Sequence, residues 1–242
     1  MIVLPAMPPE QTASWLGLLD LHERLSDGWT LIGGQLVHLH CAERGQFPVR
    51  PTNDADTVID VRADPTMLAT FTGVLTELGF TSAGISAEGL QHRWVRGDAS
   101  IDVLLPDGVG ERASLRRGVT GSPTLPTAGG TQALQRSETV AVTVSGRAGF
   151  VRRPNLVGAL VGKAAALSNA GDSGLGRHRR DFAILAGLST ARDFRNEALT
   201  KKDRQRLRAM VAAVRKDRAT LLEIPNAEAS LGRLVTAGEL DP

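Results

Sequence analysis

The sequence predicts an α+β fold in which a small mixed β-sheet domain with helices is followed by a mainly helical C-terminal domain. Two observations support this prediction. Short β-branched and aliphatic runs, separated by Gly- and Pro-bearing turns, dominate residues 1–152. From Pro154 onward the apolar residues recur at helical spacing instead. We therefore expect two domains, residues 1–152 and 153–242.

The N-terminal domain is predicted to open with a helix over residues 10–26, because its tryptophan and leucines form an apolar stripe. Gly97-Asp98 predicts a tight hairpin. Residues 106–130 are rich in Gly, Pro, Ser and Thr, and we expect them to be mainly loop. The other expected elements are a strand at 30–32, a helix at 35–44, a strand at 57–61, a helix at 65–78, strands at 80–83, 92–96 and 100–105, and a hairpin of 139–144 with 148–152.

Three helices are expected in the C-terminal domain. The first runs over 155–168 and is capped by Asn155, whose side chain can accept a backbone hydrogen bond. A glycine-rich break from Gly171 to Gly176 precedes the second helix, over 177–186. The third, over 201–222, is long and basic. Residues after 192 carry no motif that indicates a function.

Charge is distributed unevenly along the 242 residues, although the net charge is only +2. Residues 1–149 hold 11 Lys/Arg against 16 Asp/Glu, whereas residues 150–218 hold 16 against 6. A basic region of this kind favours polyphosphate or nucleic acid as a partner, although solvated helix faces rich in Arg are the alternative. The lone Cys41 excludes an internal disulfide. No apolar run approaches the roughly 20 residues of a membrane span, and no signal peptide is evident. We expect a cytoplasmic protein with no membrane partner.

Two carboxylates mark the candidate site. Asp54 and Asp56 project from the same side of the predicted strand, and such close like charges favour a shared cation. Hard oxygen ligands suit Mg²⁺ or Mn²⁺. A solvated strand start is the alternative. Asp102 lies within an apolar run, where an unpaired carboxylate is costly, so we expect it to meet a metal or a buried cation. Together the three carboxylates can hold two Mg²⁺ ions for phosphoryl-group displacement, with Asp102 near the attacking hydroxyl.

The Gly33-Gly34 pair and Thr52 extend this site. Backbone N–H groups at a glycine turn that opens a helix allow a phosphate to approach, and Thr52 can offer a hydroxyl to the same ligand. Asp60 is in phase with the carboxylates but lies some 13 Å along the strand, so it is interpreted as structural. His38 and His40 would lie on different faces of a helix, which argues against a zinc site.

Gly33-Gly34 followed by Arg50-Pro51-Thr52-Asn53-Asp54-Ala55-Asp56 resembles the G-G…R-x-[ST]-x-D-x-D signature of the DNA polymerase β-like nucleotidyltransferase superfamily. Within it, the sequence is most similar to the abortive-infection toxin nucleotidyltransferases, the AbiEii and MenT-like group. Lys163 and Arg180-Asp181 match the helical lysine and the Arg/Lys-Asp pair of that group. The resemblance implies a helical domain that closes over the nucleotide. It also implies that Lys163 and Asp181 take part in catalysis, and that the NTP contacts Gly33, Gly34, Arg50, Thr52, Lys163 and Arg179.

The leading hypothesis is therefore a toxin-like enzyme that transfers a nucleotide from an NTP to RNA, with the tRNA 3′ end as the expected acceptor and an antitoxin as a further partner. The basic residues of 201–218 could contact the RNA backbone. Two alternatives stay open: a nucleotidyltransferase that acts on a small hydroxyl compound such as an antibiotic, and a non-catalytic nucleotide- or RNA-binding module. For single residues, the alternatives are a surface position for Lys163 and a pairing of Asp181 with Arg177 on its own helix.

Overall fold

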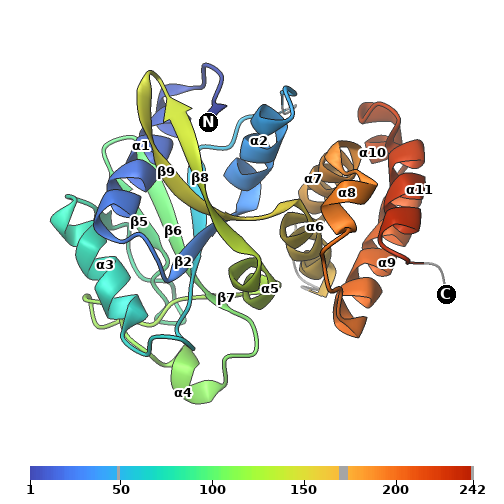
Figure 1. Cartoon of the computed structure of the whole chain (residues 1–242). Helices are drawn as coiled ribbons and strands as arrows, with labels where there is room; N and C mark the ends of the chain where they lie inside the picture. Colours follow the sequence, from blue (N-terminus) through green and yellow to red (C-terminus); the bar gives the residue numbers. More distant parts are fainter. Residues whose placement is uncertain (48–49, 169–173, 241–242) are drawn as a thin grey trace. The chain divides into compact units, whose positions relative to one another are not determined.

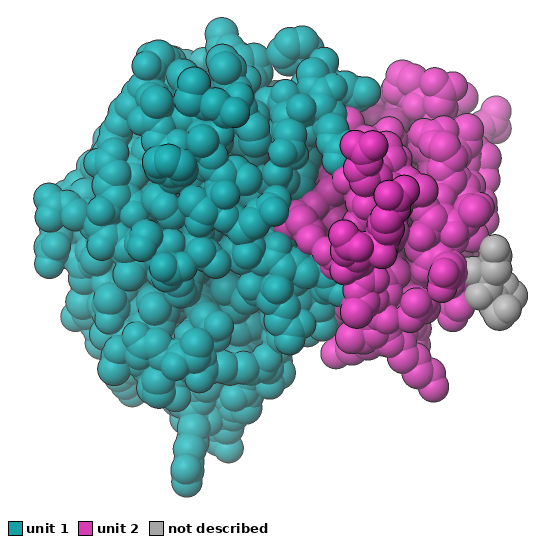
Figure 2. Space-filling model, in the orientation of Figure 1, with its two compact units in different colours: residues 1–154 teal, residues 155–242 magenta. Residues whose placement is uncertain are grey.

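The computed structural model describes residues 1–47, 50–168 and 174–240, whose helices and strands are drawn in Figure 1. The chain divides into two units, Met1–Pro154 and Asn155–Pro242 (Figure 2). Unit 1 mixes strands and helices, and unit 2 is helical. The predicted α+β fold class is thus confirmed. None of the helices in the described ranges combines the length and the apolar character that a bilayer crossing requires.

A mixed β-sheet forms the centre of unit 1. Its strand order is β2-β3-β6-β5-β4, with β7 paired to the end of β6. β3 and β6 run parallel, whereas the other neighbours along this order are antiparallel. The predicted hairpin at Gly97-Asp98 joins β5 and β6. The strands are β2 (Trp29–Ile32), β3 (Asp54–Ile59), β4 (Thr81–Ser82), β5 (Arg93–Arg96), β6 (Ala99–Pro106) and β7 (Pro126–Thr127).

A second, three-stranded sheet has the order β1-β8-β9 and contains the predicted late hairpin. Its strands are β1 (Ile2–Val3), β8 (Ser137–Val144) and β9 (Arg147–Pro154). The helices of unit 1 are α1 (Pro9–Arg24), α2 (Gly33–Glu43), α3 (Met67–Glu77), α4 (Glu111–Ser114) and α5 (Gly130–Gln135). α1 packs against β3 and β6 of the large sheet and against β9 of the small one. Its buried Trp15, Leu18 and Leu19 therefore belong to the core between α1 and the two sheets.

Unit 2 is built around α7, which packs against α6, α9 and α11. Phe182 and Leu185 of α7 are fully buried. Asn155 caps α6 as predicted, because its side-chain oxygen accepts the backbone N–H of Gly158 at 2.9 Å. The helices are α6 (Leu156–Ala165), α7 (Leu175–Leu188), α8 (Ala191–Phe194), α9 (Lys201–Arg215), α10 (Arg218–Glu223) and α11 (Ala227–Ala237), with a 3₁₀ turn at Ala166–Ser168.

The predicted helix over 201–222 is wrong, because it breaks into α9 and α10. Asp217 lies at the break, and its carboxylate accepts the backbone N–H of Thr220 at 3.2 Å. An Asp in this role ends one helix and caps the next. Residues 106–130 are mostly loop but contain α4 and β7, and α5, α8 and α11 had no counterpart in the prediction. The start of the predicted break Gly171–Gly176 lies outside the described residues, and α7 begins at Leu175.

Candidate functional site

Three carboxylates from two neighbouring strands meet on one face of the large sheet. β3 and β6 are in register with Asp56 opposite Asp102, and Asp54 precedes Asp56 by two residues and so shares its face. One oxygen of each carboxylate lies within 4.8 Å of one oxygen of each of the others. β3 begins at Asp54 rather than at Thr57, because its first residues already pair with β6. We call these three residues the carboxylate cluster.

The Gly33-Gly34 turn lies directly against the cluster. Gly33 has φ +75°, and a Cβ atom built on it would lie 1.8 Å from Oδ2 of Asp56. A Cβ on Gly34 would lie 2.6 Å from Oγ1 of Thr52. Thr52 in turn donates its hydroxyl to Oδ1 of Asp54 at 3.3 Å. Both glycines are therefore demanded by the close approach of the turn to these side chains.

Ser14 and Thr57 hold the backbone of the two strands that carry the cluster. The Ser14 hydroxyl is buried in α1, donates to the carbonyl of Asn53 at 2.7 Å and accepts the N–H of Ser100 at 2.9 Å. Thr57 donates its hydroxyl to the carbonyl of Asp102 at 2.7 Å. These bonds fix where β3 and β6 begin relative to each other, and they thereby fix the spacing of the carboxylates.

Arg93 is the residue of this site that the sequence interpretation missed. It lies on β5 directly opposite Asp102. Its Nε and Nη2 donate to the two oxygens of Asp102, each at 2.8 Å, and Nη2 also donates to Oδ2 of Asp54 at 2.9 Å. Hydrogen bonding to Asp102 raises the pKa of the Arg93 guanidinium. The cation beside Asp102 is therefore Arg93, although its side chain is partly exposed rather than buried.

A signal for Arg93 was present in the sequence. The two-residue turn Gly97-Asp98 fixes the hairpin register, so that Arg96 faces Ala99 and, three pairs further, Arg93 faces Asp102. The predicted turn, with its strand register, therefore already predicts the contact between Arg93 and Asp102.

The residues present suit a hard divalent ion. The donors are carboxylate oxygens, which Mg²⁺ and Mn²⁺ prefer. Three carboxylates and one guanidinium give these four residues a net charge of −2. Asp54 is 38% exposed at its side chain, so the cluster is open to solvent on that side, whereas Asp102 is buried.

Asp60 and Arg50 lie at the two ends of β3. Asp60 follows the strand, and its carboxylate accepts the backbone N–H groups of Arg62 and Ala63 at 3.1 and 3.0 Å. Asp60 is thus a turn residue, as interpreted from the sequence. The carbonyl of Arg50, in the loop before β3, accepts a hydrogen bond from Nε2 of His38 at 2.8 Å.

In unit 2, Lys163 of α6 and Asp181 of α7 face each other. Lys163 Nζ donates to Oδ2 of Asp181 at 2.7 Å, and their side chains are 8% and 4% exposed. A surface position for Lys163 is therefore wrong, and Lys163 reaches Asp181 from a different helix. Arg179, two residues before Asp181 on α7, donates its Nε to Asp217 at 2.6 Å.

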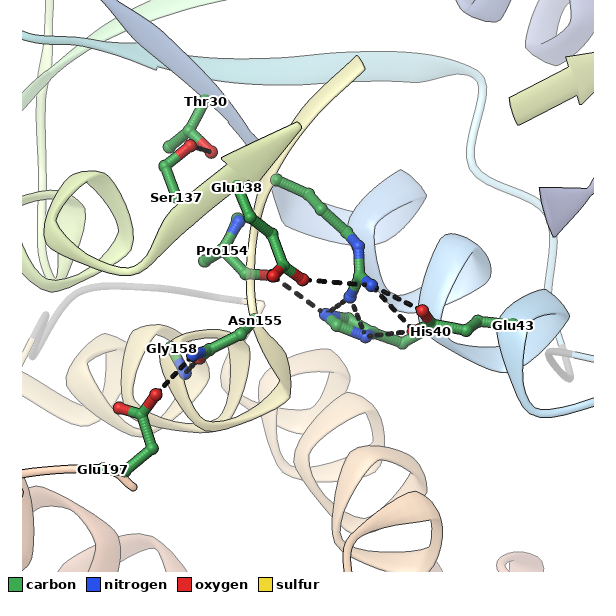
Figure 3. A network of polar contacts seen from close by, with 10 residues as sticks. Thr30, His40, Glu43, Ser137, Glu138, Pro154, Asn155, Gly158 and Glu197 are labelled. Atoms are coloured by element: carbon green, nitrogen blue, oxygen red, sulfur yellow. Dashed lines mark hydrogen bonds and ion pairs between the residues drawn. The ribbon is translucent and has the colours of Figure 1, made fainter. Parts of the chain in front are cut away.

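A second buried polar group in unit 1 involves His40, labelled with Glu43 in Figure 3. Arg153 donates Nη2 to both oxygens of Glu43, at 2.7 and 2.8 Å, and donates Nη1 to Nδ1 of His40 at 2.6 Å. His40 Nε2 donates to the carbonyl of Pro154 at 3.2 Å. Burial lowers the pKa of His40 to about 4, so the ring is neutral near pH 7. His40 serves as a hydrogen-bonding core residue here, and Cys41 beside it is buried too.

Comparisons with known proteins bear on the fold. No protein-family model matches the chain, and no curated protein matches its sequence. Among solved structures, the chain is similar to an antigenic nucleotidyltransferase-like protein from Paracoccidioides brasiliensis, with a TM-score of 0.52, 15% identity and 94% of both chains covered. It also matches the antibiotic-resistance factor ANT(2'')-Ia with a TM-score of 0.46, 13% identity, and coverage of 90% of this chain and 97% of the other. The second likeness adds no support at that score. The first shows that the chain shares the fold of a nucleotidyltransferase-like protein.

Proposed function

We propose that this chain is a metal-dependent nucleotidyltransferase, which transfers a nucleotide from an NTP to a hydroxyl acceptor and releases pyrophosphate. The observation that carries the proposal is the meeting of Asp54, Asp56 and Asp102 against the Gly33 turn. The fold shared with a nucleotidyltransferase-like protein supports the same class of reaction. The signature around Gly33-Gly34 and Asp54-Ala55-Asp56 supports it independently of the fold.

The cluster would hold the divalent ion, Mg²⁺ or Mn²⁺, through carboxylates from β3 and β6. When bound, such an ion neutralises phosphate charge and lowers the pKa of the attacking hydroxyl. In the reaction the acceptor oxygen forms a bond to the α-phosphorus, and the bond from that phosphorus to the pyrophosphate breaks. The hydroxyl proton passes to the carboxylate cluster. We assign Asp102 to the acceptor side, because it comes from a different strand than Asp54 and Asp56.

The nucleotide phosphates are assigned to the glycine turn. α2 begins on Gly33 without a side-chain cap, so the N–H groups of its first turn can donate to a phosphate. Thr52 offers a hydroxyl and Arg50 a guanidinium from the loop before β3. In unit 2 we assign Lys163 to the triphosphate, with Asp181 orienting its ammonium. Arg179 of the same helix as Asp181 is assigned to the nucleotide as well, and it would have to leave Asp217 to reach it. Unit 2 is proposed to close over the nucleotide.

We propose RNA as the acceptor, with the 3′ end of tRNA as the specific site and a toxin-like role controlled by an antitoxin. The support is the excess of Lys and Arg over residues 150–218, to which the exposed Lys201, Lys202, Lys216 and Arg218 contribute. Such charges would contact the phosphate backbone, and binding would weaken steeply with added salt.

A small hydroxyl compound is the second candidate acceptor, and one feature of unit 2 favours it. Several of its arginines are engaged with carboxylates, which reduces the positive charge that an RNA would meet. These ion pairs are Arg179–Asp217 at 2.6 Å, Arg180–Glu223 at 2.6 Å and Arg215–Glu228 at 2.8 Å.

One transfer assay tests both candidates. The full-length chain is incubated with Mg²⁺ or Mn²⁺, each labelled NTP in turn, and either total tRNA or a panel of hydroxyl-bearing antibiotics. We expect labelled tRNA, and we expect Asp54→Asn to lower the rate by roughly 10³-fold, about 4 kcal/mol, because the metal loses a charged ligand. Asp60→Asn, which changes the turn residue after the same strand, should keep the activity.

Transfer only to an antibiotic would select the second candidate. An absence of transfer to every acceptor, with all four NTPs and either metal, would contradict the enzyme. Binding of Mg²⁺–NTP under those conditions would then favour the non-catalytic module.

A further inference from the structure

Arg93 occupies a defined place among the carboxylates. Arg93, Asp102 and Asp56 are directly opposite one another on β5, β6 and β3, so they form one row across the same face of the sheet. Asp54 lies on that face one pleat away. The Arg93 guanidinium bridges Asp102 and Asp54 with three hydrogen bonds of 2.8, 2.8 and 2.9 Å. Both oxygens of Asp102 and one oxygen of Asp54 therefore already serve a cation of the chain itself.

We propose that Arg93 is the resident counter-cation of the carboxylate cluster and competes with the divalent ion for Asp102 and Asp54. The inference rests on the proposed function, because it presumes that the cluster binds a metal. Arg93 is a positioning residue in this view: it holds the carboxylates together while no metal is bound. The arginine side chain is 43% exposed, so the guanidinium can withdraw into solvent when a metal takes its oxygens.

Charge arithmetic supports the competition. Three carboxylates and Arg93 carry a net charge of −2, which one divalent ion neutralises. A second divalent ion would bring the same group to +2 before the triphosphate arrives, so Arg93 disfavours the two-metal state in the absence of nucleotide. Guanidinium fits carboxylates bidentately, and its bonds to Asp102 have this geometry.

The test is Mn²⁺ binding to the full-length chain, measured by titration calorimetry without nucleotide. We expect Arg93→Gln to bind Mn²⁺ on the order of tenfold more tightly than the wild type, because a positive charge next to the ion is gone. Arg93→Lys keeps the charge but loses the bidentate geometry, and it should fall between the two. Arg96→Gln is the matched control. It removes an arginine from the same strand, one whose guanidinium pairs with Asp20, and it should leave the affinity unchanged.

Thermal unfolding provides a second readout. Without metal, Arg93→Gln should unfold at a lower temperature than the wild type, because Asp54 and Asp102 then repel each other, and saturating Mn²⁺ should raise its Tm by more than it raises that of the wild type. If the wild type binds Mn²⁺ and folded Arg93→Gln binds it no more tightly, the competition is overturned while the metal site stands. If neither protein binds Mn²⁺, the metal site of the proposed function itself is overturned.

Discussion

The Lys163–Asp181 pair of unit 2 and the carboxylate cluster of unit 1 both set a cation against aspartate, but they balance charge differently. Lys163 and Asp181 face each other as an ion pair, with side chains 8% and 4% exposed. Arg93 faces three aspartates instead, and its own side chain is 43% exposed. The first pair is buried and electrically balanced, whereas the second group is open and keeps negative charge. The buried pair therefore supports the fold of unit 2, whereas the open cluster with its net negative charge is where we propose that a metal binds.

The largest effect on stability is expected from breaking the buried pair. Lys163→Met should lower the free energy of unfolding by about 3–5 kcal/mol, because Asp181 loses its counter-charge inside the protein. Lys163→Met combined with Asp181→Leu should recover most of that loss. Chemical denaturation of the single and double variants measures both.

Arg180→Gln, on the helix that carries Asp181, supplies the control. Its pair with Glu223 is about one-third exposed on both sides, so the loss should stay below about 1 kcal/mol. If Lys163→Met were no more destabilising than Arg180→Gln, the buried Lys163–Asp181 pair would contribute no more to stability than an exposed ion pair, which would contradict its assigned role in the fold.

A second substitution disturbs the open cluster without changing its charge. Gly33→Ala requires an alanine at positive φ, so it should lower the free energy of unfolding by at least roughly 1–2 kcal/mol of left-handed strain. Its Cβ would also meet Asp56 and displace that carboxylate, so the variant should bind Mn²⁺ more weakly. Gly45→Ala is matched, because Gly45 has φ +65° with nothing within 4 Å of a Cβ. Unfolding curves and Mn²⁺ titration of both variants separate strain from the loss of the carboxylate position. Equal Mn²⁺ affinities would show that the turn does not shape the cluster.

Much of unit 1 could be predicted from its sequence, because the turns and strands that local residue patterns favour are the ones that the tertiary structure contains. The glycine pair, the alternating aspartates and the Gly97-Asp98 turn each determine a short-range geometry, and β2, β3, β5 and β6 form close to where these signals place them. The start of β3 differs because pairing with β6 extends the strand to Asp54. Such an extension depends on a neighbour some 45 residues away, which periodicity does not reveal.

Unit 2 was harder to predict, since its decisive features are contacts between helices. The pairing of Lys163 with Asp181 depends on how α6 packs against α7, and a helical pattern alone leaves Lys163 free to point to solvent. The break at Asp217 was hidden because this residue lies between the basic residues Lys216 and Arg218 in a sequence that has no glycine or proline there. Asp217 there caps α10 and also accepts a hydrogen bond from Arg179 of α7, and both contacts stabilise the break.

His40 is a third case beside the buried ion pair and the open carboxylate cluster, because it is a buried basic group that stays neutral. Its folded-state pKa of about 4 lies below the ordinary 6.5, so the unfolded chain binds a proton first as the pH falls. The stability that His40 contributes is thus fully present above pH 6.5 and is lost progressively from pH 6.5 to about 4, by up to about 1.4 kcal/mol per pH unit.

His40→Gln removes the titrating ring, so its unfolding free energy should depend less on pH in that window than the wild type's does. Glu43, whose pKa is lowered by its contact with His40 and by the Arg153 guanidinium, adds acid sensitivity only below its ordinary value of 4.5. Urea unfolding at pH 7, 6 and 5 measures the slope, with the half-buried His92→Gln as the control. An unchanged slope in His40→Gln would mean that the ring takes up its proton within the folded protein. The His40–Arg153 contact would then be a pair of like charges, which the carboxylates of Glu43 and Glu138 would have to hold together.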